Sequence, residues 1–116
     1  MSVAFTEQAV VERRKTVTRR KGWLFLKPGD RLTLCRKVMG RKPGEPLVRL
    51  VDVEVVSIRR ERLSHVDVTG ELDLEGFPDL STTEFIETYF EPQGIHALDL
   101  VTRIEWRYLD DQEAVA

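Results

Sequence analysis

Residues 13–30 read RRKTVTRRKGWLFLKPGD, and this stretch decides the first half of the predicted fold. The β-branched run at residues 16–18 favours extended backbone, so we predict a strand there. The KPGD segment at residues 27–30 predicts a tight turn, because proline presets one φ angle and glycine supplies the positive φ of a type II turn. We therefore expect a strand, an apolar connection, and a turn that leads into a second strand.

Side chains along an extended segment point alternately to its two sides. Strict alternation would place Thr18 and Arg20 on one side and Lys15, Val17 and Arg19 on the other. A bend at Lys15, where a preceding helix ends, would instead gather Lys15, Thr18 and Arg20. The sequence leaves both arrangements open, and it also allows a solvated basic connector.

Hydrophobic periodicity predicts further elements outside this stretch. Helical spacing predicts one helix over residues 5–13, and a capping box at Ser81 and Glu84 predicts another that stops before Pro92. Alternation of apolar and polar residues predicts strands over 31–38, 47–58 and 98–109, with a loop rich in glycine and proline over 39–46.

These elements predict an α+β fold in a single domain over residues 1–110, followed by a disordered tail over 111–116. Several curling strands in so short a chain bury more apolar surface in a small barrel than in an open sheet. We therefore expect a mixed β-barrel of about five to six strands, with two or three short flanking helices.

Composition restricts the classes of function. Apolar residues make up 41% of the chain and charged residues 33%, which is typical of a folded globular protein. No run approaches the ~18 apolar residues of a membrane helix, and residues 1–11 lack a signal-peptide pattern, so we expect a cytoplasmic location and no membrane partner. With one cysteine, Cys35, and two distant histidines, we predict no metal and no other cofactor.

Charge is distributed unevenly along the chain. Residues 12–42 contain 12 Lys or Arg and 2 acidic residues, while the remainder contains 6 basic and 18 acidic residues. Such asymmetry fits a positive face that holds one anionic partner. It fits equally well a fold in which the two segments neutralise each other.

Three segments together resemble the ASCH domain family, which is similar in fold to PUA domains. They are RRKTVTRR at residues 13–20, LKPGD at 26–30 and EGF at 75–77. The family signature is a glycine, a lysine two positions later, and an arginine five positions after the lysine. Lys15 and Arg20 match it, but Arg13 stands in place of the glycine.

The resemblance implies a site and an activity. Some small bacterial members are amidohydrolases that remove the acyl group from N4-acylated cytidine, using a lysine, a threonine and a glutamate. These roles fall on Lys15, Thr18 and Glu75, with Glu71 and Glu84 as open alternatives for the acid.

The implied chemistry is coherent. A threonine hydroxyl is a weak nucleophile until a base takes its proton, and a lysine is such a base only when neutral. Cationic neighbours lower the pKa of a lysine, and the sequence supplies four. We expect these arginines and one aromatic residue to bind the ligand: Arg13, Arg14, Arg19, Arg20 and Trp23. The sequence leaves open whether Trp23 stacks on a base or belongs to the edge of the core.

The sequence leaves more than one function open. The first is the amidohydrolase, and the alternative is a non-catalytic module that binds a nucleoside or single-stranded RNA. A ribonuclease is less attractive because His65 and His96 form no credible catalytic pair. We expect a monomer or a weak dimer.

Overall fold

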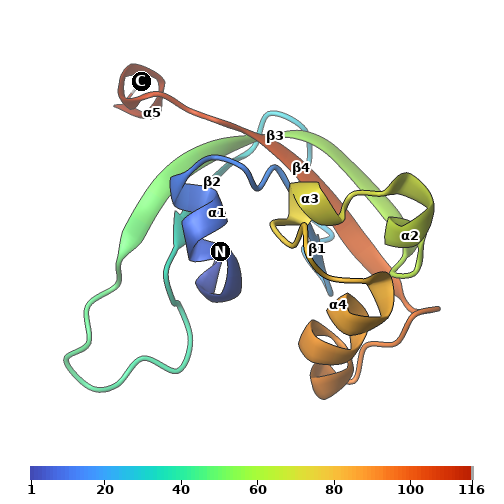
Figure 1. The fold of residues 1–116 in the computed structure, drawn as a ribbon. Coiled ribbons are helices and arrows are strands. Elements are labelled where there is room, and N and C mark those ends of the chain that lie inside the picture. Colours follow the sequence, from blue (N-terminus) through green and yellow to red (C-terminus); the bar gives the residue numbers. More distant parts are fainter. Residues whose placement is uncertain (116) are drawn as a thin grey trace.

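The computed structural model describes residues 1–115, and its centre is one antiparallel sheet of four strands in the order β1-β4-β3-β2 (Figure 1). The strands are β1 (Val17–Arg20), β2 (Arg31–Cys35), β3 (Arg49–Arg62) and β4 (Leu100–Tyr108). A register shift between Val55 and Ser57 interrupts the pairing of β3 with β4. Such a bulge bends and twists a strand, and the two long strands arch over the N-terminal helix and α4 in Figure 1.

The α+β class is confirmed, but the sheet does not close into the expected barrel. It has four strands rather than five to six, and β1 and β2 form its two edges within residues 1–115. One bridge between Ser2 and Cys35 extends the β2 edge. The predicted strand over 31–38 stops at Cys35, and the segment that follows to residue 48 forms turns and loops, in agreement with the loop predicted over 39–46.

The helices are more numerous than predicted. They are η1 (Ala4–Thr6), α1 (Glu7–Val11), α2 (His65–Thr69), α3 (Leu72–Glu75), α4 (Thr82–Tyr89), η2 (Glu91–Gln93) and α5 (Asp111–Val115). Of these, α1, α3 and α4 lie beneath the arch of the sheet (Figure 1). The capping box of α4 is confirmed, since Ser81 Oγ accepts from the Glu84 amide and the Glu84 carboxylate accepts from the Ser81 amide. Two of the additional helices, α2 and α3, lie in a segment for which no element was predicted.

Residues 111–115 form α5, where we expected a disordered tail; residue 116 lies outside the described part of the chain. The cause is a local cap. Asp110 Oδ1 accepts a hydrogen bond from the Glu113 amide at 2.7 Å, which satisfies a free N–H group at the start of the helix.

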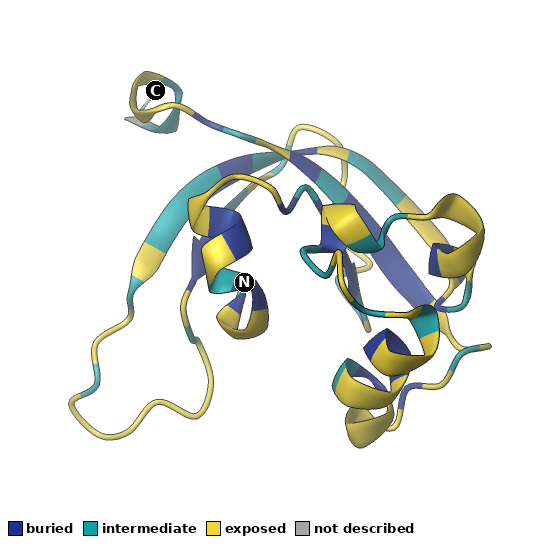
Figure 2. Ribbon diagram, viewed as in Figure 1, coloured by how far each residue is buried: buried dark blue, intermediate teal, exposed yellow. Residues whose placement is uncertain are grey.

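Two clusters of buried side chains form the core (Figure 2). One joins the N-terminal helix to β2, β3 and β4, and the other packs α2 and α4 against the opposite end of the arch. Their members include Val10, Leu34, Val53, Ile104 and Trp106 in the first and Leu63, Val66, Phe85, Phe90 and Val101 in the second. Among the described residues, no helix is long and apolar enough to cross a membrane.

Candidate functional site

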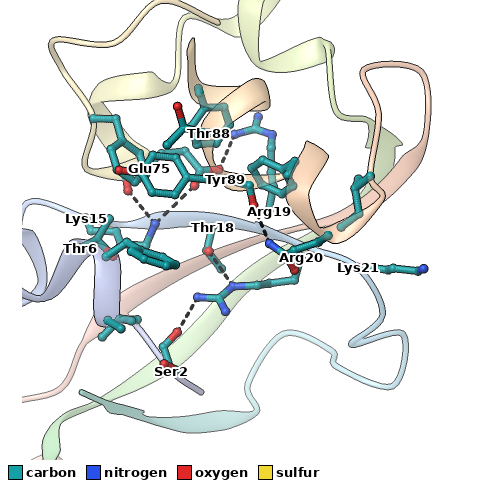
Figure 3. A pocket seen from close by; sticks show the side chains of 18 of the residues that line it. Ser2, Thr6, Lys15, Thr18, Arg19, Arg20, Lys21, Glu75, Thr88 and Tyr89 are labelled. Atoms are coloured by element: carbon teal, nitrogen blue, oxygen red, sulfur yellow. Dashed lines mark hydrogen bonds and ion pairs between the residues drawn. The ribbon is translucent and has the colours of Figure 1, made fainter. Parts of the chain in front are cut away.

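A cavity of about 520 Å³ opens between the two core clusters (Figure 3). Its walls come from the N-terminal segment, β1, the end of α3, and α4 with η2. Six of the residues predicted for the site line it, namely Lys15, Thr18, Arg19, Arg20, Trp23 and Glu75.

Lys15 precedes β1, which begins at Val17, so strand alternation does not govern its direction. Its amide donates to the Ala9 carbonyl oxygen at 3.2 Å. Its own carbonyl oxygen accepts from Trp106 Nε1 at 3.0 Å and from the Tyr108 hydroxyl. These contacts hold the bend, and the arrangement that gathers Lys15, Thr18 and Arg20 at one cavity is the one that the structure contains.

The Lys15 ammonium group is buried, with only 2% of the residue exposed. Its Nζ donates to the backbone oxygen of Glu75 at 2.6 Å and to Glu75 Oε1 at 3.3 Å. Burial lowers the pKa of Lys15 to about 8; the Glu75 carboxylate opposes this effect, while Arg20 and Arg19 add to it. A substantial fraction of Lys15 is therefore neutral near pH 8.

Glu75 is the acid at the cavity among the three candidates. Glu84 caps α4 on the surface, and Glu71 lies behind the cavity wall. The backbone places Glu75, because the Thr16 amide donates to the Leu74 carbonyl oxygen at 2.9 Å and thereby ties α3 to the chain beside Lys15.

A buried charge network supports Glu75 from behind. Arg19 Nη1 donates to Glu75 Oε2 at 2.9 Å, and Arg19 Nη2 donates to Glu71. Arg103 donates to both oxygens of Glu71, at 2.9 and 2.7 Å. Hydrogen bonds from Arg103 and Arg19 hold the pKa of Glu71 at about 2, so this carboxylate is ionised at neutral pH.

Thr18 and Arg20 form the wall opposite Glu75. Arg20 Nε donates to Thr18 Oγ1 at 3.1 Å, and Arg20 Nη2 donates to the carbonyl oxygen of Ser2 at 2.7 Å. Among the described residues, no hydrogen bond joins Lys15 Nζ to Thr18 Oγ1. The residues described also contain no group of acidic, histidine or cysteine side chains that could hold a metal ion.

Comparison with solved structures reveals the fold family. The chain matches an Enterococcus faecalis V583 protein of the DUF984 family with a TM-score of 0.63 at 14% identity, covering 95% of this chain and 71% of that one. It also matches an ASCH protein from Zymomonas mobilis, with a TM-score of 0.59 at 15% identity, covering 97% of this chain and 73% of that one. The chain has the ASCH-domain fold. A tyrosine-to-phenylalanine mutant of the Zymomonas protein matches with the same TM-score, at 13% identity over 97% of this chain and 75% of the mutant. No family model and no curated protein matches the sequence.

In this ASCH-fold chain the backbone at the position of the signature glycine has a conformation that glycine favours. Arg13 adopts a φ of 61°, in the left-handed region that favours glycine. The chain leaves α1 through this residue and turns toward Lys15. The Arg13 side chain lies outside the cavity, with its guanidinium 5.6 Å from the ring centroid of Tyr108. Arg14 also lies outside, where it pairs with Glu12 on the surface.

An aromatic wall of the cavity was not predicted from the sequence. Phe85 and Phe90 on and after α4 are buried, but Tyr89 is only half-buried and lines the cavity. Its ring centroid lies 4.6 Å from that of Phe77 and 5.2 Å from that of Phe5. Phe77 follows Glu75 and Gly76 in the resemblance motif, which was an available signal, whereas Phe5 gave none.

The charge asymmetry is partly neutralised within the fold. Exposed basic residues of the segment pair with acids from near and far in sequence: Arg36 with Glu7, Lys27 with Asp30 and Lys37 with Glu45. These pairs leave less of the segment available for a continuous positive face than the sequence allowed.

Proposed function

We propose that the cavity binds a cytosine nucleoside and that Lys15, Thr18 and Glu75 hydrolyse an acyl amide on its N4 nitrogen. The observation that carries the proposal is a buried lysine with a pKa of about 8, on the wall of a nucleoside-sized cavity that also presents a threonine hydroxyl. The resemblance of the three motif segments to ASCH-family amidohydrolases supplies the substrate class.

The hydrogen bonds of Lys15 suit a general base. A neutral lysine amine carries two N–H groups and one lone pair, and Glu75 offers two acceptors to Nζ. With both N–H groups directed at Glu75, the lone pair of Lys15 is free to take the Thr18 proton. Glu75 therefore orients Lys15 as the general base. Its negative charge also attracts the exocyclic N–H group of the cytosine.

The reaction then proceeds in two halves. Thr18 Oγ1 loses its proton to Lys15 and attacks the acyl carbon, and Arg20, whose Nε donates to Oγ1 at 3.1 Å, positions the hydroxyl for the attack. The C–N bond breaks as the Lys15 ammonium returns the proton to N4. Lys15 then takes a proton from water, which attacks the acyl-threonine ester. The ester C–O bond breaks as Lys15 returns this proton to Thr18 Oγ1, and the carboxylic acid is released.

The experiment is hydrolysis of N4-acetylcytidine, followed by its absorbance change. We expect turnover by the wild type and a loss of at least about 100-fold in Lys15→Met. Lys27→Met is the matched control, because Lys27 has a side chain that is 76% exposed and lies outside the cavity. No turnover by the wild type would contradict the hydrolase.

A second candidate is a module that binds RNA without hydrolysing it. Trp23 lines the cavity and stacks 5.7 Å from Phe25, which is largely exposed, and this pair offers a surface for unstacked bases. RNA binding that weakens steeply with rising salt, together with no turnover, would favour this candidate. A cytoplasmic location and a monomer or weak dimer remain predictions for both candidates.

A further inference from the structure

Arg20 is the guanidinium of the cavity wall without a carboxylate partner. Its Nε and Nη2 donate to neutral oxygens, those of the Thr18 hydroxyl and the Ser2 backbone. Nη1 makes no hydrogen bond to any residue in the described part of the chain. This nitrogen is not one of the fully buried polar atoms that lack a hydrogen bond, so it is exposed, and Arg20 lines the cavity.

The other buried cations of the wall are compensated. Lys15 faces Glu75, and Arg19 lies between Glu75 and Glu71. Lys21, which follows Arg20, also lines the cavity, is exposed, and forms no ion pair with a residue of the described range 1–115. The wall therefore carries two neighbouring positive charges that form no ion pair with a carboxylate of residues 1–115, although the charge of Glu75 acts on Arg20 from across the cavity.

A charge without a directly bonded counter-ion is costly in a largely desolvated position. Burial lowers the pKa of Arg20 and the Glu75 carboxylate opposes this effect only in part, although an arginine stays protonated at every physiological pH. An anion in contact with Nη1 would remove the cost, and the planar guanidinium is well suited to phosphate oxygens.

We infer that Arg20 and Lys21 form a subsite for the phosphate group of a nucleotide, so the ligand of the cavity is anionic rather than a neutral nucleoside. The inference rests on the proposed function for the nucleobase itself. The phosphate has two sources, a free nucleotide or an RNA strand. A second hollow of about 280 Å³ shares Lys21 and Ile95 with the cavity, which gives a neighbouring nucleotide space beyond Lys21.

The test is direct binding, followed by the fluorescence of Trp23, which lines the cavity. Cytidine, cytidine 5′-monophosphate, cytidine 3′-monophosphate and a four-nucleotide RNA are titrated into the purified protein. We expect at least one phosphate-bearing ligand to bind about 10-fold or more tightly than cytidine. Preference for a monophosphate identifies a nucleotide as the source, and still tighter binding of the RNA identifies a strand.

Two variants assign the preference to the subsite. Lys21→Met removes one positive charge and leaves the hydrogen bonds of Arg20 to Thr18 and Ser2 in place, whereas Arg20→Gln removes the guanidinium itself. Both should reduce the phosphate preference several-fold, and Lys21→Met should also leave cytidine affinity near that of the wild type, with Lys27→Met as the control. Equal affinity for cytidine and all phosphate-bearing ligands, or equal weakening of every ligand by the variants, would overturn the subsite.

This readout needs no turnover, so the two proposals fail separately. Cytidine binding without any phosphate preference would overturn the subsite alone. A phosphate preference in a protein that does not hydrolyse N4-acetylcytidine or its monophosphate would overturn the hydrolase alone.

Discussion

Arg19 Nη1 and Glu75 Oε2 lie 2.9 Å apart in the interior, and both side chains are almost completely buried. The same carboxylate accepts from Lys15 through its other oxygen. One acid thus compensates two buried cations, one of which is the proposed base. The position and the protonation of Lys15 consequently depend on a network that extends well behind the cavity wall.

Replacing Glu75 by glutamine tests this network. Lys15 and Arg19 would each lose a carboxylate partner, and an unpaired buried charge costs about 3 kcal/mol or more. We expect the free energy of unfolding, measured by urea denaturation, to fall by about that amount in Glu75→Gln. Glu87→Gln is the control, since Glu87 is exposed on α4. Equal stability of the two variants would contradict the account.

The pH dependence of hydrolysis follows from the pKa of Lys15, which is lowered from 10.5 to about 8. In the proposed mechanism the active form is the neutral amine, so we expect kcat/KM to rise with pH and to level off above about pH 8. Glu75→Gln should move the midpoint to lower pH, because Glu75 favours the protonated amine. An activity that falls as pH rises from 7 to 9 would exclude Lys15 as the base.

The lowered pKa of Lys15 also predicts how the free energy of unfolding depends on pH. Between pH 8 and 10.5 the unfolded chain holds the Lys15 proton more tightly than the folded protein does. The contribution of Lys15 to the free energy of unfolding therefore increases as pH rises through that window. Lys15→Met should abolish this part of the pH dependence while leaving that of the remaining groups.

Gly76 fixes the end of α3 and, with it, Glu75. Its φ is 97°, and an added Cβ would lie 3.2 Å from both Ala9 Cβ and Thr6 Cγ2. We expect Gly76→Ala to lower the free energy of unfolding by about 3 kcal/mol, from backbone strain and from overpacking together. Gly70→Ala is matched, because Gly70 has a φ of 66° but open space around it, and should cost only about 1 kcal/mol. Equal losses would show that packing against α1 is unimportant.

At Arg13 we expect the opposite effect, namely that introducing a glycine stabilises the protein relative to an alanine. Its φ of 61° costs energy for any residue with a Cβ, so glycine should be favoured there. Arg13→Ala removes the contact with Tyr108 but keeps the strain, and Arg13→Gly removes both. We expect the glycine variant to be more stable than the alanine variant by about 1 kcal/mol in chemical denaturation. A less stable glycine variant would mean that the left-handed turn is not strained.

The sequence could predict the individual helices and strands better than it could predict whether the strands close into a barrel. The capping box at Ser81 and the strand over Leu100–Tyr108 follow from short-range patterns. The barrel was wrong although each predicted strand region contains a strand, because the pairing order β1-β4-β3-β2, which leaves two open edges, depends on contacts between distant residues that local patterns do not show. The helix α3 was not predictable from periodicity, because four residues are too few to show one.

The site depended on contacts between distant residues. The sequence could not decide whether the chain bends at Lys15, because the residues that hold the Lys15 carbonyl oxygen, Trp106 and Tyr108, lie far away on β4. The choice of Glu75 over Glu71 likewise depends on how α3 meets the segment before β1. A run of basic residues does not show which of its side chains face the cavity. Arg14 lies at the surface instead, where it pairs with Glu12.

The central claim is that Thr18 attacks an acyl group on cytidine within this cavity. Steady-state hydrolysis of N4-acetylcytidine at pH 8 by the wild type, Thr18→Val and Thr83→Val tests it most directly, since Thr83 is exposed on α4 and has the same side chain. We predict turnover by the wild type and by Thr83→Val, and a loss of about 1,000-fold or more in Thr18→Val, with all three proteins folded. Turnover by Thr18→Val at the wild-type rate would contradict the account.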